Sequence, residues 1–241
     1  WGVLARANDA IWVVGDNGTL LKCSESSKSC SSIGAGTSAA LYDLWISSSN
    51  TVYAVGTGGT VTTCKTGQSA CTSTPLATTR DLNIIQGRDS ASGSSIWIAG
   101  DGGTVFQGDG VAPWKPVGTT SQANLYGISG DGNGRTIIVG NSGTILSCSD
   151  TTAPGCAVLP PLPGVDDLSS VWQRPSGEFW AVGALGTVVK CPSPTAGSTC
   201  SLIPMTGVEY LWDVTQNQAG DIIIVGDSGT VFKCGDTSCT A

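Results

Sequence analysis

Four oxygen-bearing side chains occupy the same position of a repeated sequence pattern, G-x-x-G-T. The residue after the first glycine is Asp16, Asp101, Asn141 or Asp227 in four copies, and Thr57 or Ala184 in the other two. Carboxylate and amide oxygens bind hard cations and sugar hydroxyls, so a ring of such residues predicts a ligand site. Asp and Asn are also common in tight turns, because they tolerate a left-handed backbone. Because Thr57 and Ala184 interrupt the ring, we favour the turn interpretation and keep the ligand site as the alternative.

Aromatic side chains recur at a second position, which follows the leucine of a Leu-x-x-aliphatic pattern. They are Trp1, Tyr42, Tyr126 and Trp212, whereas Asn83 and Ser169 take the equivalent place in the remaining copies. Such rings could stack on sugars, with their apolar faces on the sugar and their polar tips in water. Packing between neighbouring repeats is the interpretation that we favour, with a ligand site as the alternative.

The titratable residues exclude several kinds of chemistry. The chain has no histidine, which excludes a Ser-His-Asp triad, a His-ligated zinc and a His-ligated haem. The three glutamates lie at different points of the repeat, so the carboxylate pair of a glycosidase is not indicated, although the adjacent Asp166 and Asp167 could help to bind a cation. With a formal net charge of −7, the 11 Lys and Arg residues predict no nucleic-acid surface. We therefore predict no catalytic residues, no cofactor, no metal site and no enzymatic activity.

The ten cysteines form five close pairs. The pairs are Cys23 and Cys30, Cys64 and Cys71, Cys148 and Cys156, Cys191 and Cys200, and Cys234 and Cys239. Local pairing with no cysteine left over predicts disulfides made in an oxidising compartment, which is extracellular, at the cell surface or periplasmic. Zinc is the alternative, but C-x-x-C spacing and histidine are both absent. No apolar run of 18 residues is present, so we predict no membrane span, and we expect a mature form trimmed after export.

A block of 13 residues, VYAVGTGGTVTTC at residues 52–64, recurs in six variants along the chain. The second glycine of the G-x-x-G-T pattern within it falls at Gly18, Gly59, Gly103, Gly143, Gly186 and Gly229, at intervals of 41, 44, 40, 43 and 43 residues. Repeats of roughly 40 residues match the blades of a β-propeller. The glycines permit the positive φ of a tight hairpin, and the apolar runs beside them indicate strands that are buried on both faces.

We therefore predict an all-β fold, a six-bladed β-propeller with four antiparallel strands in each blade. The Leu-x-x-aliphatic segment forms the first strand, the runs beside the turn form the second and third, and the fourth begins near the second cysteine. Disulfides then join the third and fourth strands in five blades. The blades span about residues 1–38, 39–79, 80–122, 123–165, 166–208 and 209–241 of a single domain, 1–241.

The third repeat has no cysteine pair. Gly108 stands in place of the first cysteine, and Trp114 lies in the region of the second. We expect the large apolar side chain to supply the packing that a disulfide supplies elsewhere.

The V-G-x-x-G-T turns give the chain a resemblance to known repeat families. It resembles bacterial exported β-propellers related to photosystem II assembly factors and to sialidase-type repeats and, loosely, tectonin lectins, in which an aromatic residue ends a blade where Trp114 stands. The resemblance covers essentially the whole chain and implies the propeller fold. The sialidase motif S-x-D-x-G-x-x-W and the WD-repeat signature are both missing, so neither function is implied.

These observations predict a secreted or cell-surface propeller that acts as a rigid, non-enzymatic module for protein binding or self-assembly. The alternative is a lectin that binds glycans at sites repeated from blade to blade. A hydrolase that uses pairs of aspartates is a third possibility.

Overall fold

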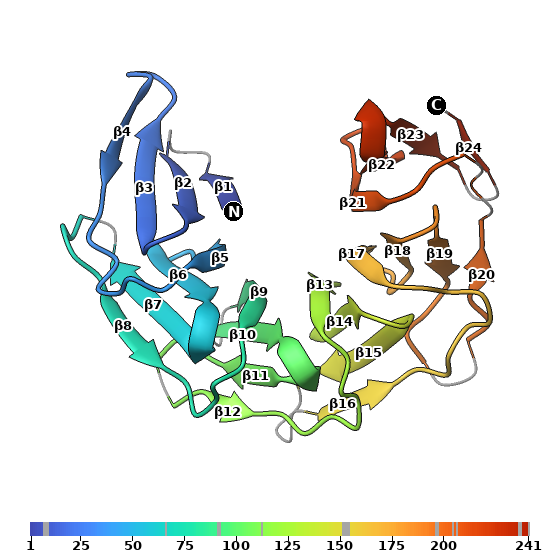
Figure 1. The fold of residues 1–241 in the computed structure, drawn as a ribbon, viewed down its shortest axis with the longest axis horizontal. Helices are drawn as coiled ribbons and strands as arrows, with labels where there is room; N and C mark the ends of the chain where they lie inside the picture. The colour runs from blue at the N-terminus through green and yellow to red at the C-terminus, as the bar shows by residue number, and fades with distance from the viewer. Residues whose placement is uncertain are drawn as a thin grey trace. The chain divides into compact units, whose positions relative to one another are not determined.

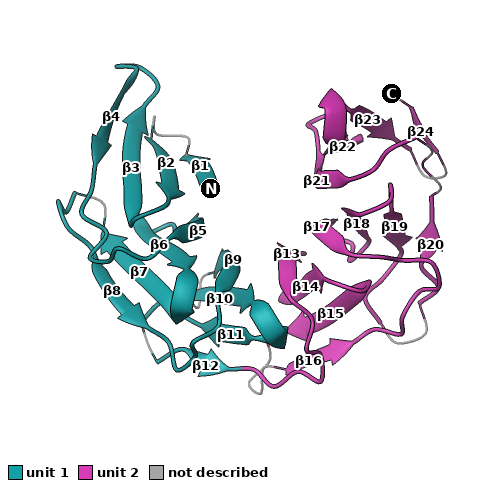
Figure 2. Cartoon of the chain, in the orientation of Figure 1, with its two compact units in different colours: residues 1–116 teal, residues 117–241 magenta. Residues whose placement is uncertain are grey.

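The computed structural model describes residues 1–6, 10–65, 67–90, 93–111, 113–150, 155–195, 198–203, 205, 207–235 and 238–240. Within these residues the chain forms six sheets of four antiparallel strands, in which the strands follow one another in chain order. This is the fold of a six-bladed β-propeller, as predicted (Figure 1). The chain divides into two compact units, unit 1 (Trp1–Pro116) and unit 2 (Val117–Ala241), coloured separately in Figure 2.

Each unit contributes three sheets, numbered here from 1 to 6 in chain order. In unit 1, sheet 1 holds β1 (Gly2–Arg6), β2 (Ala10–Gly15), β3 (Thr19–Ser24) and β4 (Ser29–Ser32); sheet 2 holds β5 (Leu41–Ile46), β6 (Thr51–Gly56), β7 (Thr60–Lys65) and β8 (Thr72–Pro75); sheet 3 holds β9 (Leu82–Ser90), β10 (Gly93–Gly100), β11 (Val105–Gly108) and β12 (Lys115–Pro116). In unit 2, sheet 4 holds β13 (Leu125–Gly130), β14 (Arg135–Gly140), β15 (Thr144–Ser149) and β16 (Gly155–Val158); sheet 5 holds β17 (Leu168–Gln173), β18 (Phe179–Gly183), β19 (Val188–Cys191) and β20 (Ser201–Leu202); sheet 6 holds β21 (Leu211–Gln216), β22 (Ile222–Gly226), β23 (Val231–Cys234) and β24 (Cys239–Thr240). That the six sheets form a single domain stays a prediction.

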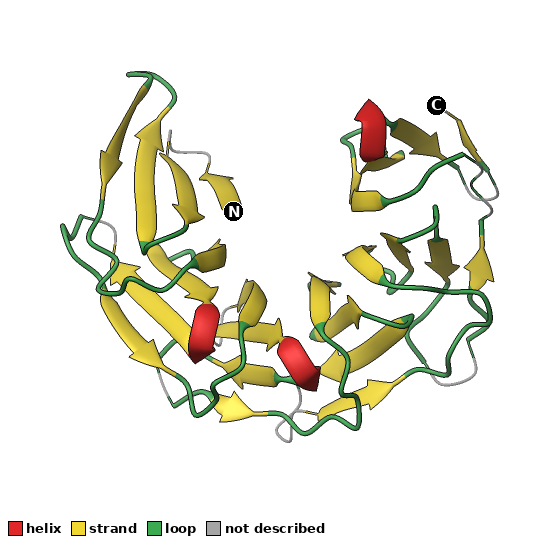
Figure 3. Cartoon of the chain, viewed as in Figure 1, coloured by secondary structure: helices red, strands yellow, loops and turns green. Residues whose placement is uncertain are grey.

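The turn between the second and third strands is the same in every sheet. Two consecutive residues have φ between 54° and 75°, and they are Asn17 and Gly18, Gly58 and Gly59, Gly102 and Gly103, Ser142 and Gly143, Leu185 and Gly186, and Ser228 and Gly229. The short 3-10 segments η1 (Thr57–Gly59), η2 (Asp101–Gly103) and η3 (Asp227–Gly229), which are red in Figure 3, are three of these turns. Paired left-handed residues define the two-residue hairpin turn whose twist matches that of the flanking strands, which explains the second glycine of the pattern.

The first glycine of the pattern is required for a different reason, which is the close approach of another backbone segment. In five sheets the backbone N–H of the residue after it donates to the carbonyl of the residue that precedes the first-strand leucine, as Thr57 does to Ala40 at 3.0 Å. This bond brings the turn onto the start of the first strand, where a Cβ on Gly56 would overlap the Ala40 carbonyl oxygen. Only glycine fits so close an approach of two backbones.

Apolar side chains fill the space between consecutive sheets within each unit. All six residues of β6 are buried, as expected for a strand covered on both faces. Trp12, Tyr53, Trp97 and Trp180 of the second strands are no more than 6% exposed, which confirms the expectation that they belong to the core. No helix of the described residues is long and apolar enough to span a membrane.

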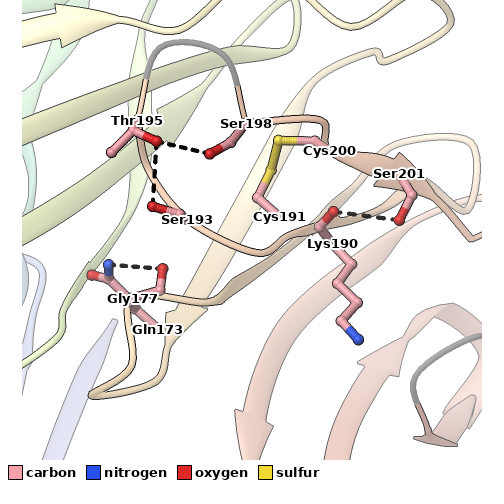
Figure 4. Close-up of a disulfide and its surroundings, with 9 residues drawn as sticks. All are labelled: Gln173, Gly177, Lys190, Cys191, Ser193, Thr195, Ser198, Cys200 and Ser201. Atoms are coloured by element: carbon pink, nitrogen blue, oxygen red, sulfur yellow. Dashed lines mark hydrogen bonds between the residues drawn. A yellow bond between two sulfur atoms is a disulfide. The ribbon is translucent and has the colours of Figure 1, made fainter.

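The five predicted disulfides are all present. Each joins the third strand of its sheet to the fourth strand or to the segment before it. Figure 4 shows the bridge from Cys191 of β19 to Cys200, beside the Ser201 hydroxyl that donates to the Lys190 carbonyl at 3.5 Å. Five local disulfides indicate an oxidising compartment.

In sheet 3, which lacks a disulfide, the indole of Trp114 covers Gly108. A Cβ on Gly108 would lie 2.6 Å from the ring, and the ring meets that of Tyr53 edge-on, with centroids 6.3 Å apart. The buried glycine makes room for the indole, so packing takes the place of the covalent link as expected.

We predict that Gly108→Ala lowers the free energy of unfolding by about 1–3 kcal/mol, because the new methyl group displaces the Trp114 ring from a packed site. Gly118→Ala is the matched control: Gly118 has open space at its Cβ position and no positive φ, and its replacement should be neutral or slightly stabilising. Urea unfolding followed by tryptophan fluorescence measures both. Equal stability of the two variants would contradict the packing of Trp114 on Gly108.

Candidate functional site

The two sets of residues singled out from the sequence are partners of each other. The Trp1 indole Nε1 donates to Asp16 Oδ1 at 2.7 Å, and the Trp212 indole Nε1 donates to Asp227 Oδ1 at the same distance. In sheet 3, Asn83 Nδ2 donates to Asp101 Oδ1 at 2.9 Å. The first turn residue is thus an aspartate in those sheets where the residue at the position after the first-strand leucine has a side-chain N–H group. Where that residue is Tyr or Ser, the turn holds Thr57, Asn141 or Ala184. The sequence itself contains this co-occurrence, which pairs the turn position with the position after the leucine.

The structure brings the candidate residues together in two groups, one in each unit. Trp1, Asp16, Tyr42 and Asp101 belong to unit 1, and Tyr126, Asn141, Trp212 and Asp227 belong to unit 2. Trp1, Tyr126 and Trp212 are 76%, 37% and 56% exposed, so they are not core residues. The ring of Trp1 nevertheless meets that of Tyr42 in the next sheet edge-on, with centroids 6.3 Å apart, so packing between repeats describes this pair.

The group in unit 2 surrounds a pocket of about 410 Å³, the unit 2 pocket. Its walls are Tyr126, Asn141, Asp167, Ser169, Tyr210 and Trp212. These residues come from sheets 4, 5 and 6, and all but Asn141, the first residue of its turn, flank a first-strand leucine. Because side chains alternate along an extended chain, the leucines point into the core, where each is fully buried, and their neighbours point out of it. Of the six, Tyr210 and Ser169 were not predicted, and Asp167 was considered only as a cation ligand.

Asp167 is held in place by its own backbone and by one carboxylate oxygen. Its Oδ1 accepts the Ser142 N–H at 2.7 Å, its N–H donates to Asp166 Oδ1 at 2.8 Å, and its carbonyl accepts the Ala184 N–H at 2.8 Å. The second oxygen, Oδ2, has no hydrogen-bond partner among the described residues. A fixed carboxylate with one oxygen left over can accept a proton from a ligand.

In unit 1 the equivalent aspartate has hydrogen-bond partners for both of its carboxylate oxygens. Asp81 occupies the repeat position of Asp167, and its Oδ1 likewise accepts the N–H of a turn residue, Gly58, at 2.9 Å. Its Oδ2, however, accepts the hydroxyl of Tyr42 at 3.4 Å. Tyr126 is the unit 2 counterpart of Tyr42, but no such bond joins it to Asp167 in the described part of the chain. The two repeat positions whose carboxylate and phenol pair in unit 1 both line the pocket in unit 2.

Tyr210 is the most perturbed group of the pocket. Partial burial raises the pKa of its phenol, and the charge of the Asp167 carboxylate raises that pKa further. The ring lies against that of Trp212, with centroids 4.2 Å apart and planes inclined by 32°. A phenol with a raised pKa stays protonated at neutral pH, so its hydroxyl can donate a hydrogen bond to a ligand.

Among the described residues no three Cys, Asp or Glu side chains gather where they could hold a metal ion. A second pocket, of about 390 Å³, lies at the hairpin of β3 and β4 in unit 1 beside the Cys23–Cys30 bridge. Lys22 and three serines line it, and it contains no carboxylate. The unit 2 pocket is therefore the stronger candidate for a site.

Asp43, in β5 of unit 1, is a further titratable residue that the sequence did not single out. Its Oδ2 accepts the Ile85 N–H at 2.9 Å. Burial raises the pKa of the carboxyl to about 6, although backbone N–H groups of Ile85 and Leu44 act in the opposite direction. The side chain is thus less stable as a carboxylate in the folded protein than in the unfolded chain.

We predict that Asp43→Asn alters the pH dependence of stability. From about pH 4, the ordinary pKa of Asp, to about pH 6, the folded value, the unfolded chain releases this proton first. Wild-type stability therefore falls as pH rises through this window. The Asn variant lacks this fall, so its stability relative to wild type should increase from pH 4 to 6 and then stay constant. Denaturant titrations at a series of pH values measure the difference, and parallel profiles would contradict a raised Asp43 pKa.

Comparison with known proteins gives no match to a family model or to a curated protein sequence. Solved structures do match. Virginiamycin B lyase from Staphylococcus aureus, in its selenomethionine form, superposes with a TM-score of 0.81 at 11% identity, over 100% of this chain and 82% of that chain. A streptogramin B lyase superposes with a TM-score of 0.79 at 14% identity, over 100% of this chain and 81% of that chain. At such identities the likeness shows the fold.

These neighbours correct the functional prediction. We predicted a non-enzymatic interaction module, with a lectin as the alternative and no enzymatic activity, and the comparisons contradict all three because both neighbours are named as enzymes. The sequence reasoning weighed carboxylates only as pairs, and so it did not consider a carboxylate beside a phenol, which can also provide acid–base chemistry. The specific resemblance to photosystem II assembly factors, sialidase-type repeats and tectonins is not confirmed. The chain is similar in fold to six-bladed lyase propellers.

Proposed function

We propose that this chain is an enzyme of the lyase class, with the unit 2 pocket as its active site. The observation that carries the proposal is the meeting of one fixed carboxylate, Asp167, with the phenol of Tyr210 in a single pocket. The names of the two structural neighbours support the reaction class. The counterpart in unit 1 supports it as well, since Asp81 Oδ2 there accepts the hydroxyl of Tyr42, whereas Asp167 Oδ2 has no such partner among the described residues.

A lyase breaks a bond by elimination, and the pocket holds a group for each half of that reaction. Asp167 Oδ2 takes a proton from a carbon of the substrate, and the electrons of that C–H bond form a new double bond. The adjacent bond to oxygen or nitrogen breaks, its electron pair leaves with the departing group, and the Tyr210 hydroxyl gives that group a proton. Neither water nor an oxidant is consumed, so the products together have the mass of the substrate. Return of the proton from Asp167 to the Tyr210 oxygen restores both groups.

The base limits the kind of substrate. A carboxylate is a weak base, so the C–H bond that it attacks must be acidified, as it is next to a carbonyl group. The exposed face of Trp212 and the ring of Tyr126 supply apolar area on which the rest of the substrate can rest. We therefore propose a carbonyl compound, such as an ester or amide, that carries its leaving group one carbon further from the carbonyl.

We further propose that the enzyme acts in an extracellular, cell-surface or periplasmic space. The five disulfides support this location.

Mass spectrometry of the products tests the reaction class. Streptogramin B, the compound named for one neighbour, is the first substrate, followed by a panel of esters and amides with an acidic C–H bond and a leaving group beside it. Elimination gives products whose masses add up to that of the substrate, whereas hydrolysis adds one water. Turnover with added water would overturn the proposal of a lyase.

We predict that Asp167→Asn lowers kcat/KM by about 10²–10⁴-fold, the usual contribution of a general base, while leaving the circular dichroism spectrum unchanged. Tyr210→Phe should lower kcat, with the largest effect on substrates whose leaving groups are poor. Asp81→Asn is the matched control, because it removes a carboxylate from the same repeat position and the same turn contact outside the pocket, and its activity should equal that of wild type. Full activity of Asp167→Asn would exclude Asp167 as the base.

A further inference from the structure

The charges at the unit 2 pocket all have one sign. Asp167 forms part of its wall, and the carboxylates of Asp166 and Asp227 act on the phenol of Tyr210 together with it. None of the six lining residues is Lys or Arg. The field inside the pocket therefore favours a positive ligand and opposes a negative one.

Two aromatic faces meet inside this negative field. The rings of Tyr210 and Trp212 lie 4.2 Å apart, and the Trp212 side chain is more than half exposed. Asp227 accepts the indole N–H at 2.7 Å, which fixes the ring and places a negative charge at its edge. Aromatic faces carry negative charge density that attracts cations, most strongly on tryptophan.

Elsewhere the chain covers tryptophan faces with its own cations. Lys22 lies 5.7 Å from the ring centroid of Trp12, and Lys190 lies 5.3 Å from that of Trp180. Arg174 lies 5.9 Å from that of Trp172. Trp212, in contrast, has carboxylates around it and no cation over its ring among the described residues. The chain thus places its own cations over three tryptophan rings of sheets 1 and 5, whereas the ring of Trp212 at the pocket is left for the cation of a ligand.

We infer that the unit 2 pocket takes a substrate with a positively charged group, a protonated or quaternary amine, which rests on the rings of Tyr210 and Trp212 beside the carboxylates. This deepens the proposed function, since it places the cation in the same pocket as the elimination. The pocket volume of about 410 Å³ lies within the range for small-molecule sites. Asp167 accepts the proton, and the aromatic pair holds the charged end of the molecule.

The test compares two probes of the same shape that differ in charge. Choline carries a quaternary ammonium group, and 3,3-dimethylbutan-1-ol is its neutral carbon analogue. Saturation-transfer NMR and quenching of tryptophan fluorescence measure the binding of each to the whole chain. We expect choline to bind at least about tenfold more tightly than the neutral analogue, and added salt to weaken choline binding alone. Equal binding of the two probes, or binding of neither, would overturn the inference.

Variants assign the binding to the pocket. Trp212→Leu should abolish choline binding, and Trp212→Phe should retain part of it because a smaller aromatic face remains. Trp1→Leu is the matched control, since Trp1 makes the same indole-to-aspartate bond in sheet 1, and it should bind choline as wild type does. Unchanged binding by a folded Trp212→Leu variant would overturn the inference. Neither probe is turned over, so choline binding without lyase activity would refute only the proposed function, and activity without choline preference would refute only the charged substrate.

Discussion

A single backbone hydrogen bond constrains the architecture of these sheets. In five of the six sheets the N–H of the first turn residue donates to the carbonyl before the first-strand leucine, so the second hairpin is tied to the start of its sheet. The bond requires a glycine where the two backbones approach, and it is followed directly by the buried leucine. The turn and the start of the first strand therefore lie together, and variable side chains gather at that end of the sheet.

The wall of the unit 2 pocket is a consequence of this arrangement. Because the leucine is buried, the residues before and after it are directed to the opposite side, and residues of neighbouring sheets meet there. At Asp81 the carboxylate meets a phenol and the contact is closed. At Asp167 the corresponding carboxylate and phenol line a cavity together with Tyr210 and Trp212. A change of partners at a few repeat positions therefore distinguishes a closed structural contact from a pocket that can take a ligand.

The fold could be predicted from the sequence because its determinants are local and repeated. Backbone conformation and burial follow directly from the glycines, the leucines and the cysteine pairs. The missing cysteine pair in the third repeat also allowed the packing of Trp114 on Gly108 to be predicted. The site was only partly predictable. Asp16, Asp101 and Asp227 were recognised as turn residues, but their indole and amide donors come from another strand. Tyr210 was missed because its repeat position holds Ala40, Asp81, Asn124, Asp167 and Tyr210 in turn, which forms no pattern, and only the packing of adjacent sheets shows what it meets.

The alternation of buried and outward residues at the first strand separates the residues that hold the fold from those that face a ligand. Leu125, Leu168 and Leu211 are fully buried, whereas the residues beside them line the unit 2 pocket. An engineer who wishes to alter the pocket can therefore vary Tyr210 or Trp212 and keep the leucines that hold the strands in place. Asp167 is a less free position, because its carboxylate also accepts the N–H of a turn residue.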